Sequence, residues 1–168
     1  STEGKEGGGY CTSIHDYEVP FIFANFNGTA HDVEVITHEA GHAFAGYRAA
    51  KKGYITDLVS PTMESCEIHS MSMEFLTQDF HHLFFGDNTR KYEISHCEDS
   101  LGFIPYGCMG DEFQHRVYEN PEMTPAQRNE LWMELEGKYR PWLDFEDLPF
   151  WSEGRTWQRQ LHIYTNPF

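Results

Sequence analysis

The chain has 168 residues, of which 39% are apolar and 15% aromatic, a size and composition that suit one domain or a large part of one. Asp and Glu number 27 against 12 Lys and Arg, so the formal net charge is −15 with neutral histidine. Such an acidic surface repels nucleic-acid phosphates and anionic lipid, so we expect neither nucleic acid nor a membrane as a partner. The first nine residues are polar rather than a signal peptide, and the four cysteines show no CxxC spacing. We therefore expect a cytoplasmic protein with reduced thiols.

A small β element is predicted near the start of the chain. Residues 1–9 are rich in glycine, Tyr10–Ile14 and Phe21–Phe26 have strand composition, and Asn27-Gly28 is a turn signal. This element is either a plain structural hairpin or an edge strand that pairs with an extended peptide beneath the glycine loop. In the second interpretation four residues contact the substrate backbone: Gly8, Gly9, Tyr10 and Cys11.

The next segment contains the motif His-Glu-x-x-His, formed by His38, Glu39 and His42. If it is helical, the two imidazoles lie one turn apart on one face, where they can hold one zinc ion. Glu39 beside them can then reach a water on that ion and act as general acid and base. The alternative is a pair of surface histidines on an amphipathic helix, which would show the same pattern.

The residues around the motif favour a helix. Its predicted start lies between Thr29 and Asp32, either of which could cap it, and it should end before Gly53. Alanines and an apolar stripe at helical spacing support this interpretation. Gly41 and Gly46 are poor helix residues, and a close approach of another backbone or of the metal would explain them.

A second helix is predicted from Ser60-Pro61, with Ser60 as its cap. Glu67 and Glu74 are seven residues apart on one face of it, within a partly apolar stripe where unpaired acids are costly. Glu67 would complete a His-His-Glu ligand set and leave one position open for water. Glu74 would orient a ligand histidine through a hydrogen bond. The alternative is that both are solvated surface acids.

The rest of the chain is predicted to be helical and irregular, with helices separated by glycine and proline. The expected segments are a helix from Thr89 with breaks at Gly102, Pro105, Gly107 and Gly110, then 111–118, a helix from Thr124-Pro125 to Gly137, and Trp151–Leu161. The fold class we expect is mainly α and zincin-like, with a small β element before the HExxH helix. Residues 1–28 would form the glycine loop and β element, and 29–168 the helical region.

The motif and its surroundings resemble the M3 family of zinc metallopeptidases. Glu67 follows His42 after 24 intervening residues, as the third ligand does in that family. Three further segments are similar to the oligoendopeptidase F and Pz-peptidase branch: 4–12, 20–29 and 111–118. The resemblance spans essentially the whole chain.

The resemblance implies a mainly helical zinc endopeptidase of short peptides, with one zinc ion held by His38, His42 and Glu67 and with Glu39 as the catalytic acid and base. His162 matches a histidine that stabilises the transition state. Tyr164 follows it where the family uses tyrosines to bind substrate. Family enzymes are several times longer, so we expect residues 1–168 to be one catalytic-centre segment whose further partner is the remainder of the same enzyme.

Two other functions fit the motif. One is a zinc metallocarboxypeptidase on a related helical fold, and the other is a non-catalytic helical fragment stabilised by zinc. Cleavage of a blocked peptide separates the first from an endopeptidase, and any peptidase activity argues against the second. No serine or cysteine nucleophile pattern is evident, because Cys66 has no base at a suitable spacing.

Overall fold

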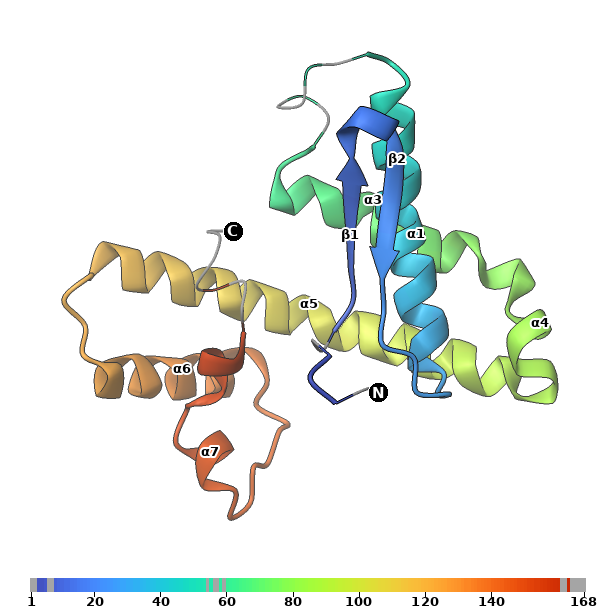
Figure 1. Cartoon of the computed structure of the whole chain (residues 1–168). Coiled ribbons are helices and arrows are strands. Elements are labelled where there is room, and N and C mark those ends of the chain that lie inside the picture. The colour runs from blue at the N-terminus through green and yellow to red at the C-terminus, as the bar shows by residue number, and fades with distance from the viewer. Residues whose placement is uncertain are drawn as a thin grey trace. The chain divides into compact units, whose positions relative to one another are not determined.

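The computed structural model describes residues 3–5, 8–53, 55, 58, 60–160 and 163. The chain divides into two compact units, Ser1–Ile94 and Ser95–Phe168, and the boundary falls within one helix, α5 (Thr89–Glu119). Most described residues are helical, and one two-stranded sheet precedes the HExxH helix, so the predicted fold class is confirmed (Figure 1).

The first unit is organised around helix α1, which carries the HExxH motif. Both strands and α3 pack against α1 (Figure 1). Its regular elements are β1 (Tyr10–Ile14), β2 (Val19–Phe23), α1 (His31–Ala50), α3 (Met63–Leu76) and α4 (His82–Phe85), with short 3-10 turns at His15–Tyr17, Gln78–Phe80 and Gly86–Asn88.

The two strands form an antiparallel hairpin in which Tyr10 lies opposite Phe23 and Ile14 opposite Val19. The rings of Tyr10 and Phe23 stack with centroids 5.1 Å apart. The first strand was predicted with these bounds, whereas the second begins two residues earlier than predicted and ends at Phe23. A 3-10 turn followed by Glu18 in the left-handed conformation (φ 52°) reverses the chain tightly, so pairing resumes at Val19.

Helix α1 covers the predicted span, but neither candidate residue caps it. Ala30 occupies the cap position without a side-chain hydrogen bond. The carboxylate of Asp32 instead accepts hydrogen bonds from the backbone N–H groups of Asn27 and Gly28, at 3.0 and 2.7 Å, and so fixes the turn that precedes the helix. Helix α3 begins at Met63, later than predicted, because its first backbone hydrogen bonds start from the carbonyl of Thr62.

In the second unit, α5 runs without interruption through the four predicted breaks. A proline inside a helix removes one backbone hydrogen bond, and each interior glycine costs about 1 kcal/mol relative to alanine. Packing offsets this cost, because Met109 and Phe113 of the same helix are buried and Tyr106 packs against them. Local propensity alone therefore predicts breaks in this helix that tertiary packing prevents.

The second unit is completed by α6 (Pro125–Tyr139) and by two short segments, α7 (Pro149–Ser152) and a 3-10 turn (Thr156–Arg159). The predicted start of α6 is confirmed: Thr124 and Gln127 form a reciprocal capping box, with proline at the first helical position. The predicted single helix over 151–161 is wrong. Gly154 has a φ of 67°, which ends the helical turn between the two short segments.

The core of the second unit is one apolar cluster contributed by α5, α6 and the final turn: Met109, Phe113, Leu131, Trp132, Leu135 and Trp157. Phe113 meets Trp132 edge to face, with ring centroids 5.0 Å apart. The indole N–H of Trp132 donates to Glu136, which also pairs with Arg140, so both the indole and this buried carboxylate have partners.

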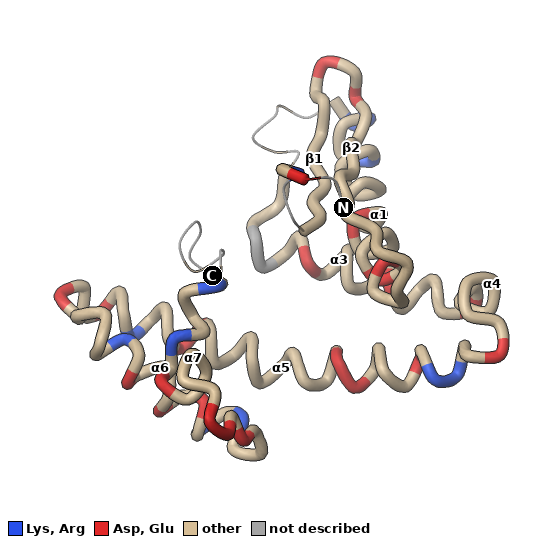
Figure 2. Tube along the Cα trace, turned by 60° about the horizontal axis from the view of Figure 1, so that its bottom comes forward, with Lys and Arg blue, Asp and Glu red and all other residues tan. Residues whose placement is uncertain are grey.

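The net charge of −15 arises from acidic residues that are spread along both units (Figure 2). Basic residues are fewer, and many of them pair with carboxylates, as Lys51 does with Glu18 and Arg116 with Glu134. Among the described residues, none of the helices has the length and apolar character needed to cross a membrane.

Candidate metal centre

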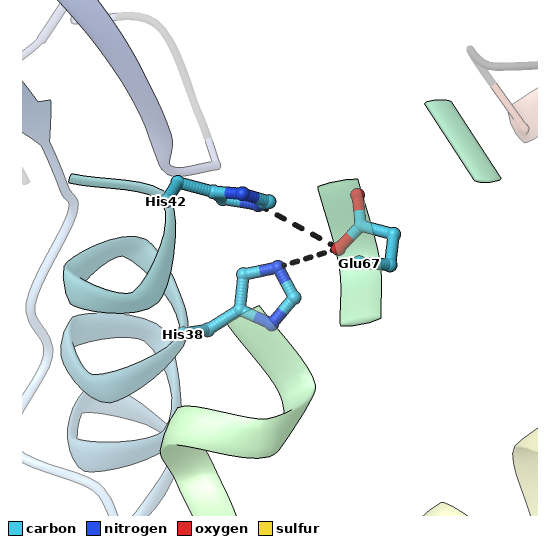
Figure 3. A group of neighbouring side chains, drawn as sticks. All are labelled: His38, His42 and Glu67. Carbon is cyan, nitrogen blue, oxygen red and sulfur yellow. Dashed lines mark ion pairs between the residues drawn. The ribbon is translucent and has the colours of Figure 1, made fainter. Parts of the chain in front are cut away.

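Three predicted ligands meet between α1 and α3. Nε2 of His38 lies 3.1 Å from Oε2 of Glu67, and Nε2 of His42 lies 3.6 Å from the same oxygen. The two imidazoles project from successive turns of α1 toward the carboxylate on α3 (Figure 3). All three ligand atoms lie within 4.8 Å of one another, and the group is the one such cluster found among the described residues.

This donor set fits a zinc ion. Zinc binds imidazole nitrogen and carboxylate oxygen at about 2.0–2.2 Å, which places neighbouring tetrahedral ligand atoms roughly 3.3 Å apart. The two nitrogen–oxygen distances bracket that value. A set of two histidines and one glutamate leaves a fourth position for water or substrate, as catalytic zinc sites require.

Glu74, which was predicted to orient a ligand histidine, contacts His38. Its Oε1 is 2.7 Å from Nδ1 of His38, on the side of the ring away from Glu67. This contact fixes the ring and leaves Nε2 directed at the ligand cluster. Burial alone would lower the pKa of His38, but the hydrogen bonds and charges of Glu67 and Glu74 outweigh it and raise the pKa to about 10.

Glu67 is held by several donors. Hydrogen bonds from His38 and His42 lower the pKa of its carboxyl well below the usual range, against the effect of burial. The hydroxyl of Ser70, one helical turn further along α3, also donates to Oε2 at 2.8 Å. The thiol of Cys66 approaches the other oxygen, Oε1, at 3.5 Å. The carboxylate is therefore ionised, as a metal ligand must be.

Glu39 differs from the other acids of the centre because it is buried, with 8% of its surface exposed. Burial raises the pKa of its carboxyl, and the charge of Glu67 acts in the same direction, while the two histidines oppose the shift. A raised pKa suits a group that accepts and returns a proton near neutral pH. Gly9 lies beside it, because a Cβ built on Gly9 would stand 3.8 Å from Oε1 of Glu39.

Of the two glycines of α1, Gly41 marks a close backbone approach, as predicted, whereas Gly46 faces a side chain instead. A Cβ on Gly41 would come within 2.6 Å of the carbonyl oxygen of His69 and of Cα of Ser70, so α1 and α3 touch there through their backbones. A Cβ on Gly46 would stand 3.1 Å from Oγ of Ser13 on β1. Gly41 lies between the two ligand histidines and so sets their separation from Glu67.

Of the predicted substrate-binding residues, the structure describes those from Gly8 to Cys11 but not Tyr164. Cys11 lies close enough to Glu39 for its charge, together with burial, to raise the pKa of the thiol. The carbonyl of Gly8 accepts a hydrogen bond of 2.7 Å from Asn25, which anchors the glycine loop to the hairpin. His162 and Tyr164 lie outside the described residues, so their roles remain predictions.

Two neighbours of the ligands had no role in the sequence-based predictions. Ser70 lies three residues after Glu67, and that spacing was sufficient to suggest a contact on one helix face. The ring of His69 lies edge-on to His42, with centroids 5.7 Å apart. Helical periodicity does not bring His69 to the face of Glu67, so no pattern in the sequence signalled it.

Together, the helical fold and the converging His-His-Glu set with an adjacent buried glutamate form a candidate metal centre of the HExxH type. A family model described as Peptidase family M3 matches residues 1–168. The chain therefore belongs to peptidase family M3. No curated protein sequence matched it.

Solved structures of related proteins show which branch of the family this chain is similar to. One structure, of a protein assigned as an oligoendopeptidase F, is 54% identical with a TM-score of 0.93 and covers 100% of this chain and 30% of its own. Pz-peptidase A, solved with an inhibitor, is 51% identical with a TM-score of 0.94 and the same coverage of 100% and 30%. A Bacillus anthracis protein, also assigned as an oligoendopeptidase F, is 46% identical with a TM-score of 0.78 over 96% of this chain and 30% of its own. The predicted resemblance to this branch is confirmed, and the chain spans about 30% of the length of these relatives.

Proposed function

We propose that the protein containing this chain is a zinc metalloendopeptidase that hydrolyses peptide bonds in short oligopeptides. The observation that carries the proposal is the convergence of His38, His42 and Glu67 beside the buried carboxylate of Glu39. Membership of peptidase family M3 supports hydrolysis of peptide bonds. The similarity to oligoendopeptidase F supports short peptides as the substrate class.

The proposed chemistry follows from the separate roles of the three predicted zinc ligands and of Glu39. A zinc ion held by the three ligands would supply Lewis acidity, lowering the pKa of water and polarising the scissile carbonyl. Glu39 accepts a proton from the attacking water and then donates it to the leaving amine nitrogen. The raised pKa of Glu39 favours the first transfer, because a more basic carboxylate accepts the proton of the water more readily.

The proposed substrate-binding surface is the free edge of β1. Within the described part of the chain the sheet has two strands, so only one edge of β1 is paired with β2. The strand begins at Tyr10, immediately after Gly9, whose position beside Glu39 places the start of this edge next to the catalytic centre. An extended peptide paired with β1 would be held by main-chain hydrogen bonds, which favours tolerance of many side chains.

His162 and Tyr164 complete the proposal through the family resemblance. His162 would stabilise the negative charge that develops on the carbonyl oxygen, and Tyr164 would contact the substrate. Removing one donor to such an oxyanion typically lowers turnover about a hundredfold to a thousandfold.

The test of the catalytic role is Glu39→Gln in the intact protein that contains residues 1–168. Glutamine keeps the shape of the side chain but is a poor base, so zinc content should stay the same while turnover falls by about 10²–10⁴-fold. The substrate is a short peptide blocked at both ends, which an endopeptidase cleaves and a carboxypeptidase does not. The matched control is Glu34→Gln on the same helix, where Glu34 pairs with His31. Near-normal turnover in the Glu39 variant would overturn the proposal.

The test of the substrate strand is amide hydrogen exchange with and without a non-hydrolysable peptide analogue. We expect slower exchange of unpaired amides within residues 9–14 when the analogue is bound, because main-chain pairing protects them. Amides of α6 serve as the internal control and should not change. Unchanged exchange across β1 under saturating analogue would exclude the strand as the binding edge.

A further inference from the structure

We propose that Ser70 is a positioning residue that holds the carboxylate of Glu67 in its metal-binding orientation. This inference rests on the proposed function, since it requires Glu67 to be a metal ligand. It assigns to a buried hydroxyl a role that the ligand motif does not include.

The contact itself is specific to one oxygen. Oγ of Ser70 lies 2.8 Å from Oε2 of Glu67, and this oxygen is the one that faces Nε2 of both ligand histidines. A carboxylate oxygen has two lone pairs, so Oε2 can accept from Ser70 with one and face a metal ion with the other. The terminal torsion of a glutamate is broad, and a second fixed contact is what selects one orientation of its oxygens.

Ser70 is fully buried, with 0% of its surface exposed, so its hydroxyl must find its partner within the protein. The other acceptors within reach are the backbone carbonyls of Glu67 at 3.2 Å and Cys66 at 3.4 Å. A hydroxyl donates one hydrogen, and the contact with Oε2 is both the shortest and the only one of the three to an ionised group. The hydrogen bond to the carboxylate is therefore the strongest of the three.

The position of Ser70 is fixed by the contact between the helices. Its Cα would lie 2.6 Å from a Cβ on Gly41, the residue between the two ligand histidines. The backbone that carries the hydroxyl is thus held directly against the backbone that carries His38 and His42. Through this pair, one helix crossing sets both the separation of the ligands and the orientation of Glu67.

The first experiment compares zinc affinity in Ser70→Ala and wild-type forms of the intact protein. Alanine removes the hydroxyl, keeps Cβ and favours helix, so the fold should persist, which circular dichroism of the metal-free protein checks. Groups that orient a metal ligand typically contribute 10–100-fold to metal affinity, and we expect a loss of zinc affinity in that range. The matched control is Ser72→Ala, because Ser72 is an exposed serine of the same helix whose hydroxyl bonds to the backbone carbonyl of Ile68. It should bind zinc as the wild type does.

The second experiment separates positioning from general destabilisation. Zinc affinity is measured for Ser70→Ala in a Glu67→Ala background, with zinc titrated high enough to saturate the two histidines. If Ser70 acts through Glu67, its loss has no further effect once the carboxylate is gone. The visible absorption of the cobalt-substituted protein is the second readout, and its band positions should shift in Ser70→Ala but not in Ser72→Ala.

The outcomes distinguish this inference from the proposed function. Wild-type zinc affinity in Ser70→Ala, or an equal fold-loss with and without Glu67, would overturn the positioning role alone. If Glu67→Ala and His38→Ala bind zinc as tightly as the wild type, the metal centre itself is misassigned and both proposals fail.

Discussion

The two units of this chain bury different kinds of groups. The second unit encloses a cluster of large apolar side chains, including Trp132, Phe113 and Leu135. The first unit buries Glu39 beside Gly9, and it buries Ser70 at the contact between α1 and α3, where the backbones meet at Gly41. Cohesion in the second unit thus comes from removing apolar area from water, whereas the first unit depends on backbone contact and on satisfied polar groups.

This difference shows what a metal centre demands of its surroundings. Carboxylates that lie close to one another and away from water are unfavourable unless a cation or a donor compensates them. In the first unit the ligand histidines and Ser70 supply part of that compensation to Glu67. We therefore expect side-chain truncation to affect mainly the stability of the second unit, and small backbone or charge changes to affect mainly metal binding in the first.

The largest stability effect should follow Trp132→Ala. This indole is 1% exposed, and removing a buried aromatic side chain typically costs about 3–5 kcal/mol through lost burial and the cavity that remains. Urea unfolding should show the loss, while zinc affinity under folding conditions should stay within about twofold, because Trp132 and the predicted ligands belong to different compact units of the chain. Phe44→Ala in α1 is the control, since Phe44 is 55% exposed and its loss should cost far less. A weaker zinc site without a change in stability would contradict this division between the units.

A single methyl group should have the next largest effect when it is placed at the helix contact. In Gly41→Ala the new Cβ meets backbone atoms at 2.6 Å, so the helices must separate. Such overpacking typically costs about 1–3 kcal/mol, and we expect zinc affinity to fall at least about tenfold because Glu67 moves with α3.

The control for this change is Gly102→Ala in α5, where a Cβ meets nothing within 4 Å. Alanine in place of an unhindered helical glycine should stabilise the protein by about 0.5–1 kcal/mol and leave zinc affinity unchanged. Calorimetric melting and zinc competition measure both quantities. Wild-type zinc affinity in Gly41→Ala would show that the helix contact does not set the ligand geometry.

The next effect concerns the protonation of the metal-free centre. In the metal-free protein the pKa of His38 is raised from 6.5 to about 10, so the stability that its protonated ring contributes is complete below pH 6.5 and is lost as the pH rises through about 10. Zinc requires the neutral ring, so at pH 7–9 binding should release about one proton, and zinc affinity should rise about tenfold per pH unit. Titration calorimetry in buffers of different ionisation enthalpy counts the protons. Binding without proton release would show that His38 is neutral before zinc arrives.

The stability of the second unit should change at acidic pH instead. Hydrogen bonds from Lys138 and Tyr139 lower the pKa of the partly exposed Glu112 carboxyl. The stability that this carboxylate contributes is therefore present above about pH 4.5 and is lost as the pH falls through its lowered pKa. The effect should be small because the pair is screened by solvent.

The features that could be predicted from the sequence are those that depend on the spacing of residues along one helix. The HExxH spacing and the shared helix face of Glu67 and Glu74 follow from helical periodicity. In the structure His38, His42 and Glu67 converge and Nδ1 of His38 lies 2.7 Å from Oε1 of Glu74, while the roles of these residues in metal binding stay predictions. The need for a close approach at Gly41 was also evident, because glycine inside a helix has a cost that must be offset.

The remaining features depend on contacts that a local pattern cannot contain. Helix α5 continues through Pro105 because tertiary packing outweighs propensity, and the cap of α1 is absent because Asp32 bonds to the preceding turn. The identity of the residue opposite Gly41 could not be predicted, since it depends on how α3 crosses α1. Ser70 was therefore visible in the sequence only as a neighbour of Glu67.

The burial of Trp132 and Trp157 makes the two units optically distinct. All four tryptophans of the sequence, at positions 132, 142, 151 and 157, lie in the second unit, and none lies in the first. Within this chain, indole fluorescence therefore reports the second unit. Its buried part comes from Trp132 and Trp157 of the apolar cluster, and the N–H of Trp132 donates to the carboxylate of Glu136. Cobalt absorption would report the other unit through its ligands. Intrinsic emission and metal absorption thus provide independent signals, with which loss of the metal centre and loss of the apolar cluster can be timed in one unfolding experiment.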